Sequence, residues 1–459
     1  MRSMIFVIAK KLLPVKFRRV LIEFLNNIII NYIFFVHYVN LVRPIVWLWK
    51  KQLKTLNVNI SNPKGTILVF NSPGGLADIE SAYLNSKSPY FIKHIEGELI
   101  KASCSYFLGR GIEDYNSGID KTNDEAREQY RDFLRKFLFE LKNDINLIGI
   151  INFNHVYHAQ VDVAKVASEM NIPFVTLLKE CLRTPQYNLE TEYVYKHIIK
   201  KYYGNKIAVH NLITKTLLLN SGIINDEQIE VVGQGRSDKL FSMRENKRKM
   251  TNDGSKNILY FQISETAGLP YFGGVFSPAT NGKSPVFNWA SLARDVWDLM
   301  IEYANSRSDV SLIVKGKPTG VYGEKLSNRN NNIEFIHGNP DMSLYEKADV
   351  VVAFNTTALA EAVAAGVPAL TTYFGIDEEK MKPYLFDWYG SVDIMRTKDE
   401  LFQKLDLYLF NDGQVDASEE NVTKLLSQYL GNTDGEAGRR VRKFIDESMN
   451  IDTVKNTVS

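Results

Sequence analysis

The chain has 459 residues, of which 45% are hydrophobic and 24% charged, and its formal net charge at pH 7 is +2. This length and composition predict a globular protein of two domains with attached segments, and the balanced charge excludes nucleic-acid binding through bulk charge. Two cysteines, Cys104 and Cys181, are too few for a disulfide framework or a zinc site and fit a reducing cytoplasm.

Residues 1–51 combine basic with apolar side chains. They hold nine Lys or Arg residues against one acidic residue, Glu23, so this segment has a net charge of +8. The run 20–39 has the length of a membrane span, but Glu23, three asparagines and a histidine make it unsuitable as a lone span. No small-residue cleavage site follows, so a secretory signal peptide is not expected. We expect amphipathic helices on an anionic membrane surface, with Trp47 and Trp49 at headgroup level; alternatively, these helices pack on the rest of the protein.

Strands and helices alternate from about residue 65 onward. The run T-I-L-V-F-N at 66–71 predicts a buried strand, and the turn after it, with Gly74 and Gly75, leads into a helix that carries Asp78. In parallel α/β folds such a turn lies at the carboxyl edge of the sheet, where ligands bind. The turn lacks G-x-G-x-x-G and so does not support a dinucleotide site. A tight turn without a ligand is the alternative.

Two further predicted strands are followed by titratable side chains. The strand at 90–95 precedes Glu98, and the strand at 147–153 precedes His155. A long, polar and charged helix is expected between them, at about 121–142. Glu and His side chains at such places are secondary candidates for moving a proton.

Another predicted strand, at 172–178, ends in the sequence K-E-C-L-R-T-P. A carboxylate at the carboxyl end of a parallel strand can take the proton from a substrate hydroxyl. Glu180 is therefore the first candidate for a general base. The alternative is that Glu180 forms an ion pair with Lys179 or Arg183 and only shapes the loop.

The first half of the chain closes with predicted strands at 206–211 and 229–232. The second of them breaks into a glycine turn that carries Arg236, and Asp238 is placed to hold that arginine. The polar stretch 241–256 has no periodic apolar face and predicts a linker between domains.

Polar side chains also end the predicted strands of the second half. The strand at 257–263 ends in Ser264 and Glu265, and a later strand ends in Lys315 and Lys317. Two lysines at the carboxyl end of a strand are well placed for a diphosphate or a sugar carboxylate. The alternative is that these lysines are simply solvated.

The stretch 349–370 predicts a strand–helix–strand unit. An apolar, β-branched run is followed by Asn355, Thr356 and Thr357, which are good N-cap residues, and then by an alanine-rich helix that carries Glu361. Such a helix start presents free N–H groups and the positive end of the helix dipole, which together suit a phosphate. An ordinary capped helix is the alternative.

Four stretches resemble parts of known glycosyltransferases. Residues 348–375 resemble the donor half of GT-B glycosyltransferases, in which the cap holds the donor phosphates and the glutamate faces the nucleotide ribose. Residues 175–185 resemble the acceptor half of GT-B proteins that build bacterial surface carbohydrates, and of the related non-hydrolysing sugar-nucleotide epimerases. Residues 231–238 resemble a stretch of the CDP-glycerol glycerophosphotransferases and capsule-type transferases, although Gly235 stands where proline is common. Residues 434–445 resemble the terminal helix of the surface-carbohydrate family.

The resemblance implies an α/β fold with two Rossmann-like domains (GT-B) that face a central cleft, and the sequence adds a basic amphipathic helical segment at the N-terminus. The expected parts are membrane-associating helices at 1–55, an acceptor domain at 56–245, a nucleotide-sugar domain at 246–430, and a crossover helix and tail at 431–459.

The same resemblance implies a membrane-associated glycosyltransferase on the cytoplasmic face of the inner membrane, acting in bacterial capsule or lipopolysaccharide synthesis. Its substrates would be a nucleotide-sugar and a glycan or lipid-linked acceptor. The donor would be UDP-linked, or CMP-linked as in the Kdo transferases, and no cofactor or metal is expected. The expected catalytic residues are Glu180, Asp78, Glu98 and His155. The expected donor-binding residues are Arg236, Ser264, Glu265, Lys315, Lys317, Asn355, Thr356, Thr357 and Glu361. The expected acceptor-side loop contains Gly74, Gly75 and Arg183.

Three rival functions keep this fold. A CDP-polyol phosphotransferase would transfer a different group, but such enzymes usually carry histidines in H-x-P loops, and here Lys317 stands where histidine is expected. A non-catalytic scaffold in a glycan assembly complex is favoured somewhat by the same departure. A sugar-nucleotide epimerase is a weaker alternative, since a soluble enzyme has no need of residues 1–51.

Overall fold

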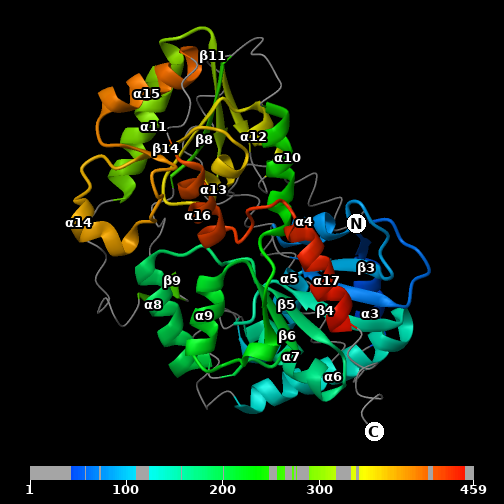
Figure 1. Cartoon of the computed structure of the whole chain (residues 1–459). Helices are drawn as coiled ribbons and strands as arrows, with labels where there is room; N and C mark the ends of the chain where they lie inside the picture. Colours follow the sequence, from blue (N-terminus) through cyan, green and yellow to red (C-terminus); the bar gives the residue numbers. More distant parts are fainter. Residues whose placement is uncertain are drawn as a thin grey trace. The chain divides into compact units, whose positions relative to one another are not determined.

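Figure 1 shows the computed structural model of the chain. It describes residues 43–56, 58–71, 74–109, 124–156, 158–199, 201–247, 256–263, 271–272, 275–276, 289–316, 332–336, 341–411 and 417–449. The chain divides into two compact units. The first unit is Met1–Ser72, Ser88–Val175 and Tyr203–Asn205, and the second is Pro73–Lys87, Thr176–Tyr202 and Lys206–Ser459. The expected domain boundaries at residues 55, 245 and 430 stay predictions.

Among the described residues, seven strands form the first sheet in the order β1-β3-β2-β4-β5-β6-β7. They are β1 (Lys54–Thr55), β2 (Thr66–Asn71), β3 (Phe91–Glu96), β4 (Leu147–Asn152), β5 (Phe174–Leu177), β6 (Lys206–Val209) and β7 (Ile229–Val231). β2 is parallel to both β3 and β4, and β6 is parallel to β7, whereas the short β1 is antiparallel to β3. The strand β4 is mostly buried, as expected for an apolar run in a parallel sheet that is covered on both faces.

In the part of the chain that the structure describes, six parallel strands form the second sheet in the order β12-β11-β8-β13-β14-β15. They are β8 (Lys256–Phe261), β11 (Val310–Lys315), β12 (Ile333–Ile336), β13 (Val350–Ala353), β14 (Ala369–Thr372) and β15 (Asp393–Met395), and a separate antiparallel pair consists of β9 (Tyr271–Phe272) and β10 (Val275–Phe276). The strand order runs outward in both directions from β8. The carboxyl ends of β8, β11 and β13 therefore meet where the order reverses, and ligands bind at such a point in open α/β sheets.

The helices of the described residues connect these strands. They are α3 (Arg43–Lys50), α4 (Gly75–Tyr83), α5 (Glu98–Leu108), α6 (Asp124–Ile145), α7 (His158–Glu169), α8 (Pro185–Val194), α9 (Leu212–Asn220), α10 (Asp238–Lys247), α11 (Trp289–Asn305), α12 (Ser343–Lys347), α13 (Thr357–Ala364), α14 (Glu378–Met381), α15 (Lys398–Phe410), α16 (Glu419–Tyr429) and α17 (Ala437–Met449). Short helical turns include η4 (Gly235–Ser237) and η6 (Lys382–Tyr384). None of the described helices combines the length and apolarity that a membrane crossing requires.

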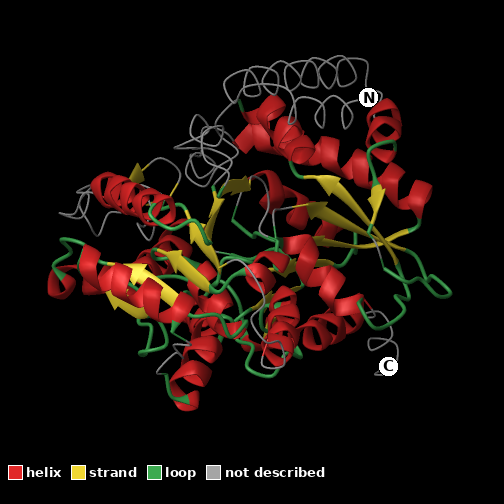
Figure 2. Cartoon of the chain, turned by 90° about the horizontal axis from the view of Figure 1, so that it is seen from above, coloured by secondary structure: helices red, strands yellow, loops and turns green. Residues whose placement is uncertain are grey.

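Helices cover both faces of the second sheet (Figure 2). Tyr260 of β8 belongs to an apolar cluster with side chains of α11 and α15. Its neighbour Leu259 belongs to a different cluster, with side chains of α10, α13 and α16. Successive strand residues point to opposite faces, so this alternation gives a three-layer arrangement with one core on each side of the sheet.

The first unit has its own apolar core, in which α6 presents a buried stripe of aromatic and leucine side chains at helical spacing. The short helix α3 joins this core through Trp49, which is 2% exposed and whose ring centroid lies 4.4 Å from that of Phe137. The expectation that Trp49 lies at headgroup level is therefore wrong, because its indole packs inside the protein. Trp47, in contrast, is 60% exposed.

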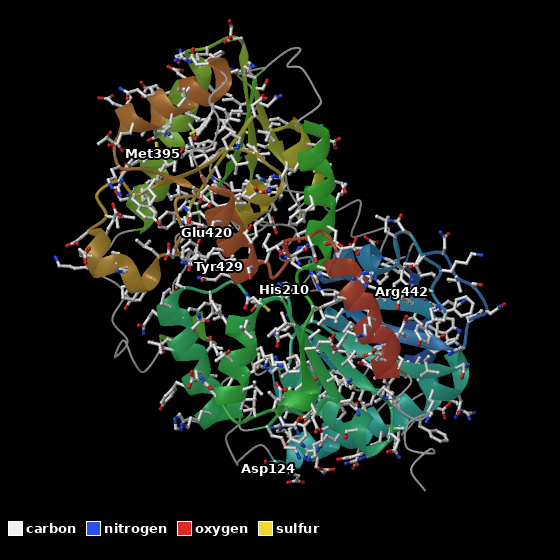
Figure 3. The ribbon with its side chains drawn as sticks, viewed as in Figure 1. Asp124, His210, Met395, Glu420, Tyr429 and Arg442 are labelled. Atoms are coloured by element: carbon white, nitrogen blue, oxygen red, sulfur yellow. The ribbon has the colours of Figure 1, made fainter. Side chains whose placement is uncertain are left out.

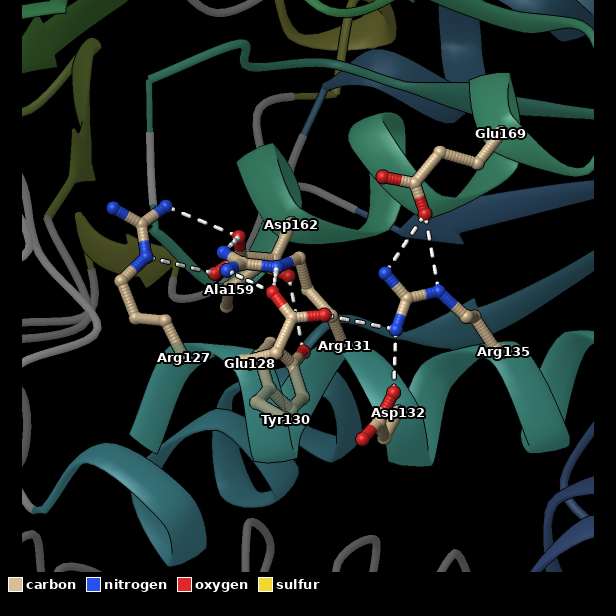
Figure 4. Close-up of polar contacts among 9 residues, drawn as sticks. All are labelled: Arg127, Glu128, Tyr130, Arg131, Asp132, Arg135, Ala159, Asp162 and Glu169. Atoms are coloured by element: carbon tan, nitrogen blue, oxygen red, sulfur yellow. Dashed lines mark hydrogen bonds and ion pairs between the residues drawn. The ribbon is translucent and has the colours of Figure 1, made fainter. Parts of the chain in front are cut away.

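A network of ion pairs fastens α6 to α7 in the first unit (Figure 4). The carboxylate of Asp162 is fully buried and accepts hydrogen bonds from Arg127 at 3.1 Å and Arg131 at 3.0 Å. One turn further along, Arg135 pairs with Glu169 of α7 at 3.0 Å. A buried carboxylate needs such partners, since an unpaired charge there would be very costly.

The last described helix, α17, packs against α4 of the second unit. Asp238, the first residue of α10, accepts hydrogen bonds from the backbone N–H groups of Ala437 at 3.0 Å and Gly438 at 2.7 Å. It thereby satisfies two N–H groups that the start of α17 leaves free. A Cβ atom at Gly438 would lie 2.7 Å from Ser81 Oγ and 2.8 Å from Asp238 Oδ2, so only glycine allows this close approach.

We expect the Gly438→Ala substitution to lower the free energy of unfolding by about 1–3 kcal/mol, because the added methyl group overpacks the junction of α4 and α17. Chemical denaturation of both proteins measures this change. Arg439→Ala, at a position of the same helix whose side chain is 75% exposed, is the control and should stay within about 0.5 kcal/mol of the original. Equal stabilities for Gly438→Ala and the original protein would contradict the packing argument.

Candidate functional site

A cavity of about 1700 Å³ lies in the second unit. Its lining comes largely from segments that follow the carboxyl ends of strands in both sheets. Gly74 follows β2, Glu180 follows β5, His210 follows β6, Lys315 ends β11, and Phe354 to Ala358 follow β13. Figure 3 labels three lining residues, His210, Tyr429 and Arg442. The cavity therefore lies where open α/β sheets bind their ligands.

The start of α13 forms one wall of the cavity. Asn355 has a positive φ of 47° and is not the cap; its side chain donates to the carbonyl of Tyr384 at 2.7 Å and accepts from the N–H of Phe386 at 3.3 Å. The N-cap is Thr356, whose hydroxyl makes no capping hydrogen bond. The first N–H groups of α13 are thus left without a side-chain cap on a wall that faces the cavity, an arrangement suited to an anion.

Glu361 lies on the same helix, lines the cavity and is 5% exposed. Its Oε2 accepts a hydrogen bond from the hydroxyl of Tyr345 at 2.9 Å, and its Oε1 lies 3.9 Å from Nη2 of Arg236. One oxygen is therefore fixed by a tyrosine, while the other faces a guanidinium beyond hydrogen-bond distance. This places the expected ribose-facing glutamate and the expected phosphate-facing arginine in one cluster.

Arg236 is held by Asp78 of α4. Its backbone N–H and its Nη1 donate to the two carboxylate oxygens at 2.9 Å and 3.0 Å. The sequence-based interpretation that Asp238 holds Arg236 is wrong, because Asp238 binds the start of α17 instead. Burial raises the pKa of Asp78, and the charge and hydrogen bonds of Arg236 oppose that rise. Asp78 is therefore the carboxylate partner of the Arg236 cation and lies behind the cavity wall.

His210 is a lining residue that the sequence analysis did not select. It follows β6, is 6% exposed, and its Nε2 lies 3.9 Å from Oδ2 of Asp78. Burial, with Arg236 and Arg183 adding to it, lowers the pKa of His210 to about 3, so the imidazole is neutral at pH 7. Its signal in the sequence was weaker than that of Glu180, because His210 fell inside the predicted strand 206–211 and not after its end.

Glu180 and Arg183 both follow β5 but differ in their surroundings. Glu180 is exposed and lines the cavity, as a base for a substrate hydroxyl should. Arg183 is 7% exposed, and its guanidinium lies 5.7 Å from the ring centroid of Tyr187. Arg183 is not a lining residue, whereas Tyr187 is.

Lys315 supplies a buried cation to the cavity wall. It is 6% exposed, and its Nζ donates to the carbonyl of Gly316 at 3.2 Å. Burial lowers the pKa of the ammonium. An ammonium that has lost water in this way gains from an anionic ligand, which would restore charge-assisted hydrogen bonds.

The remaining candidates are placed as follows. Gly74 lines the cavity with a φ of 82°, and Gly75 begins α4. Glu98 begins α5 in the first unit, and its side chain is outside the described part of the structure. His155 is buried after β4 in the same unit and does not line the cavity. Ser264, Glu265 and Lys317 lie outside the described residues. In the part of the chain that the structure describes, no three His, Cys, Asp or Glu side chains are grouped to hold a metal ion.

Comparisons with known proteins rest on structure. No protein-family model matches the chain, and no curated protein matches its sequence. The wall teichoic acid polymerase TagF, in a structure soaked with CDPG, is 10% identical with a TM-score of 0.50, covering 93% of this chain and 98% of that one. The UDP-GlcNAc 2-epimerase of Neisseria meningitidis bound to UDP-GlcNAc is 15% identical with a TM-score of 0.44, covering 83% and 99% of the two chains. An α,α-trehalose-phosphate synthase of Burkholderia xenovorans in complex with glucose-6-phosphate is 10% identical with a TM-score of 0.45, covering 84% and 100%.

The similarity to TagF extends over nearly the whole of both chains. Together with the two mainly parallel sheets, it confirms the α/β, GT-B part of the expected fold class, whereas residues 1–42 of the expected N-terminal helical segment lie outside the described residues. The chain has an α/β structure with the GT-B fold.

Proposed function

We propose that this chain is a glycosyltransferase that moves a sugar from a nucleotide-sugar donor to a glycan or lipid-linked acceptor in bacterial surface-polysaccharide synthesis. One observation carries the proposal: the uncapped start of α13, the buried ammonium of Lys315 and the guanidinium of Arg236 line one cavity. These groups suit the phosphates of a nucleotide, and they stabilise the negative charge that develops as the nucleotide leaves.

The size of the cavity supports a reaction between two substrates. Pockets for one small ligand typically enclose about 300–1000 Å³, and this cavity encloses about 1700 Å³. The anion-binding groups of α13 and β11 form the donor end of the cavity. The segment after β5, with Glu180, and His210 after β6 form its acceptor end.

In the proposed reaction the acceptor hydroxyl attacks the anomeric carbon of the donor sugar. A new C–O bond forms, the bond from that carbon to the donor phosphate breaks, and the nucleotide takes both electrons of the broken bond. Glu180 or His210 accepts the hydroxyl proton. Lys315 and the N–H groups of α13 stabilise the leaving phosphate, so the described residues supply the charge for this step without a cofactor or a bound metal.

A CDP-polyol phosphotransferase is the second candidate. TagF, whose structure was soaked with CDPG, covers more of this chain than the other two solved structures described above. The same donor end would then hold a cytidine nucleotide. The acceptor oxygen would attack the phosphorus that carries the polyol, the bond from that phosphorus to the bridging oxygen of the diphosphate would break, and CMP would leave with both electrons. The choice between these reactions depends on the donor and is open to a direct binding measurement.

A place at the cytoplasmic face of the inner membrane is part of the proposal. Residues 1–51 carry a net charge of +8, which favours anionic lipid headgroups. In the first unit, Trp47 is 60% exposed and Phe139 of α6 is 59% exposed. Arg43 and Lys50 of α3 pair with Glu140 and Asp144 of α6, which fixes the helix that carries Trp47. Exposed aromatic side chains beside basic ones are typical of proteins that lie on a membrane.

We expect calorimetry with CMP, CDP, UDP and GDP to show binding of at least one nucleotide. Lys315→Met should weaken that binding about 10- to 100-fold, the effect of losing a hydrogen bond to a charged group. Lys347→Met, at an exposed lysine outside the cavity, is the matched control and should bind as the original protein does. If none of the four nucleotides binds, the transferase proposal fails and a non-catalytic scaffold is favoured.

The identity of the base has its own test. Once a donor is known, release of its nucleotide in the presence of bacterial lipid extract reports turnover. Glu180→Gln should lower turnover by about 10²- to 10⁴-fold, the usual contribution of a general base, and leave nucleotide affinity unchanged. Glu227→Gln, at an exposed position outside the cavity, is the control. Full turnover in Glu180→Gln together with a loss in His210→Gln would assign the base to His210.

Membrane binding is tested by flotation of the full chain with phosphatidylglycerol-containing vesicles. We expect the double substitution Trp47→Glu and Phe139→Glu to reduce the bound fraction about tenfold or more, since burying an aromatic side chain contributes about 1.5–3 kcal/mol. Leu212→Glu, at a residue of the second unit that is 67% exposed, is the control. An equal reduction in the control, or none in the double variant, would remove Trp47 and Phe139 from the membrane-binding surface.

A further inference from the structure

Four titratable side chains form a chain of contacts along the cavity wall. Oε1 of Glu361 lies 3.9 Å from Nη2 of Arg236, Nη1 of Arg236 lies 3.0 Å from Oδ2 of Asp78, and the same oxygen lies 3.9 Å from Nε2 of His210. All but Asp78 line the cavity. The contacts join α13 of the donor end to the histidine of the acceptor end.

Arg236 is able to contact an anion without first leaving its place. Its Nη1 and backbone N–H are used by Asp78, but its Nη2 is 3.9 Å from Glu361, beyond hydrogen-bond distance. The backbone of Gly74 leaves room beside the guanidinium, because even a Cβ at this glycine would remain 3.9 Å from Cζ of Arg236. A phosphate in the cavity can therefore approach the face that Asp78 does not cover.

Two basic side chains, Arg236 and His210, lie near the same carboxylate oxygen of Asp78. Arg236 makes a hydrogen bond of 3.0 Å to Oδ2, and His210 stays at 3.9 Å from the same atom, too far for a hydrogen bond. Any ligand that attracts the guanidinium weakens its hold on Oδ2. The imidazole N–H would then have a carboxylate to bind, which is how an acidic side chain orients and charges a catalytic histidine.

The charges that face His210 come from three elements. Asp78 belongs to α4, Arg236 to η4, and Arg183 to the segment after β5. Cys181 lies in that last segment too, and its sulfur accepts a hydrogen bond from the backbone N–H of His210 at 3.3 Å. The two arginines and burial together oppose protonation of the imidazole. A bound phosphate offsets the arginine charge and so makes protonation easier.

We propose that Arg236 couples the arrival of an anionic phosphate at the donor end to proton acceptance by His210, through the carboxylate of Asp78. The inference rests on the proposed function, since it takes the phosphate to be that of a nucleotide. It makes Arg236 and Asp78 positioning residues. It also assigns an order to the reaction, in which His210, the alternative to Glu180 as the base, can take the acceptor proton only when the donor is in place.

The test is a pH titration of the full chain by NMR, with ¹³C at the histidine Cε1 positions and His210→Gln to assign the signal. In the free protein the His210 signal should not titrate above pH 5. With a saturating nucleoside diphosphate, its midpoint should rise by about 1–3 pH units, the usual effect of a nearby opposite charge. Arg236→Gln should raise the midpoint in the free protein and leave little further change on adding nucleotide.

Matched variants separate coupling from general effects. Arg396→Gln removes an arginine outside the cavity, one that pairs with Glu378 at 3.0 Å, and should leave the midpoint and its response unchanged. Arg236→Lys keeps a positive charge beside Asp78, so the titration midpoint of His210 in the free protein should stay nearly as low as in the original. This variant serves as the test if Arg236→Gln does not fold. If nucleotide binds by calorimetry and the midpoint stays in place, the coupling is wrong and the proposed function stands. If no nucleotide binds, both fail.

Discussion

The buried contact between Asp78 and Arg236 is the interaction on which the cavity depends. Removing one partner of a buried ion pair typically costs about 3–5 kcal/mol, since the other charge is left without compensation. Here the pair also fixes backbone, because the N–H of Arg236 binds the same carboxylate. Ser81 of α4 adds a hydrogen bond to the carbonyl of Gly235 at 2.8 Å. These hydrogen bonds hold the turn after β7 against α4. The two segments together form part of the cavity wall.

The second half of the cavity could be predicted from the sequence because its signals are local. A short apolar run, three polar residues and an alanine-rich helix identified the start of α13, and a lysine at the carboxyl end of a predicted strand identified Lys315. Both follow from one rule, that strand ends of a parallel sheet share an edge. The conformation of Asn355 could not be predicted from local sequence. Its positive φ and its hydrogen bonds to residues 384 and 386 depend on a turn about 30 residues further along the chain.

The residues that the sequence analysis misassigned or missed have a common physical explanation. Asp238 stands two residues from Arg236 and was taken as its partner, but the true partner is 158 positions away. His210 lay inside the predicted strand 206–211, where a single histidine is usually interpreted as an ordinary core residue. Trp49 and Trp47 are alike in sequence context, yet only packing against Phe137 decides which of them is buried. Contacts between distant segments decide all three cases, and a single sequence does not display them.

The buried ammonium of Lys315 has a chemical consequence of its own. A lysine whose pKa is lowered by burial spends more of its time as the free amine, and the free amine is the form that attacks acylating reagents. The cavity is wide enough to admit a small reagent. Acylation of Lys315 would therefore report whether the proposed donor end is occupied. A ligand bound there would protect the amine from the reagent, and this can be measured before any acceptor is known.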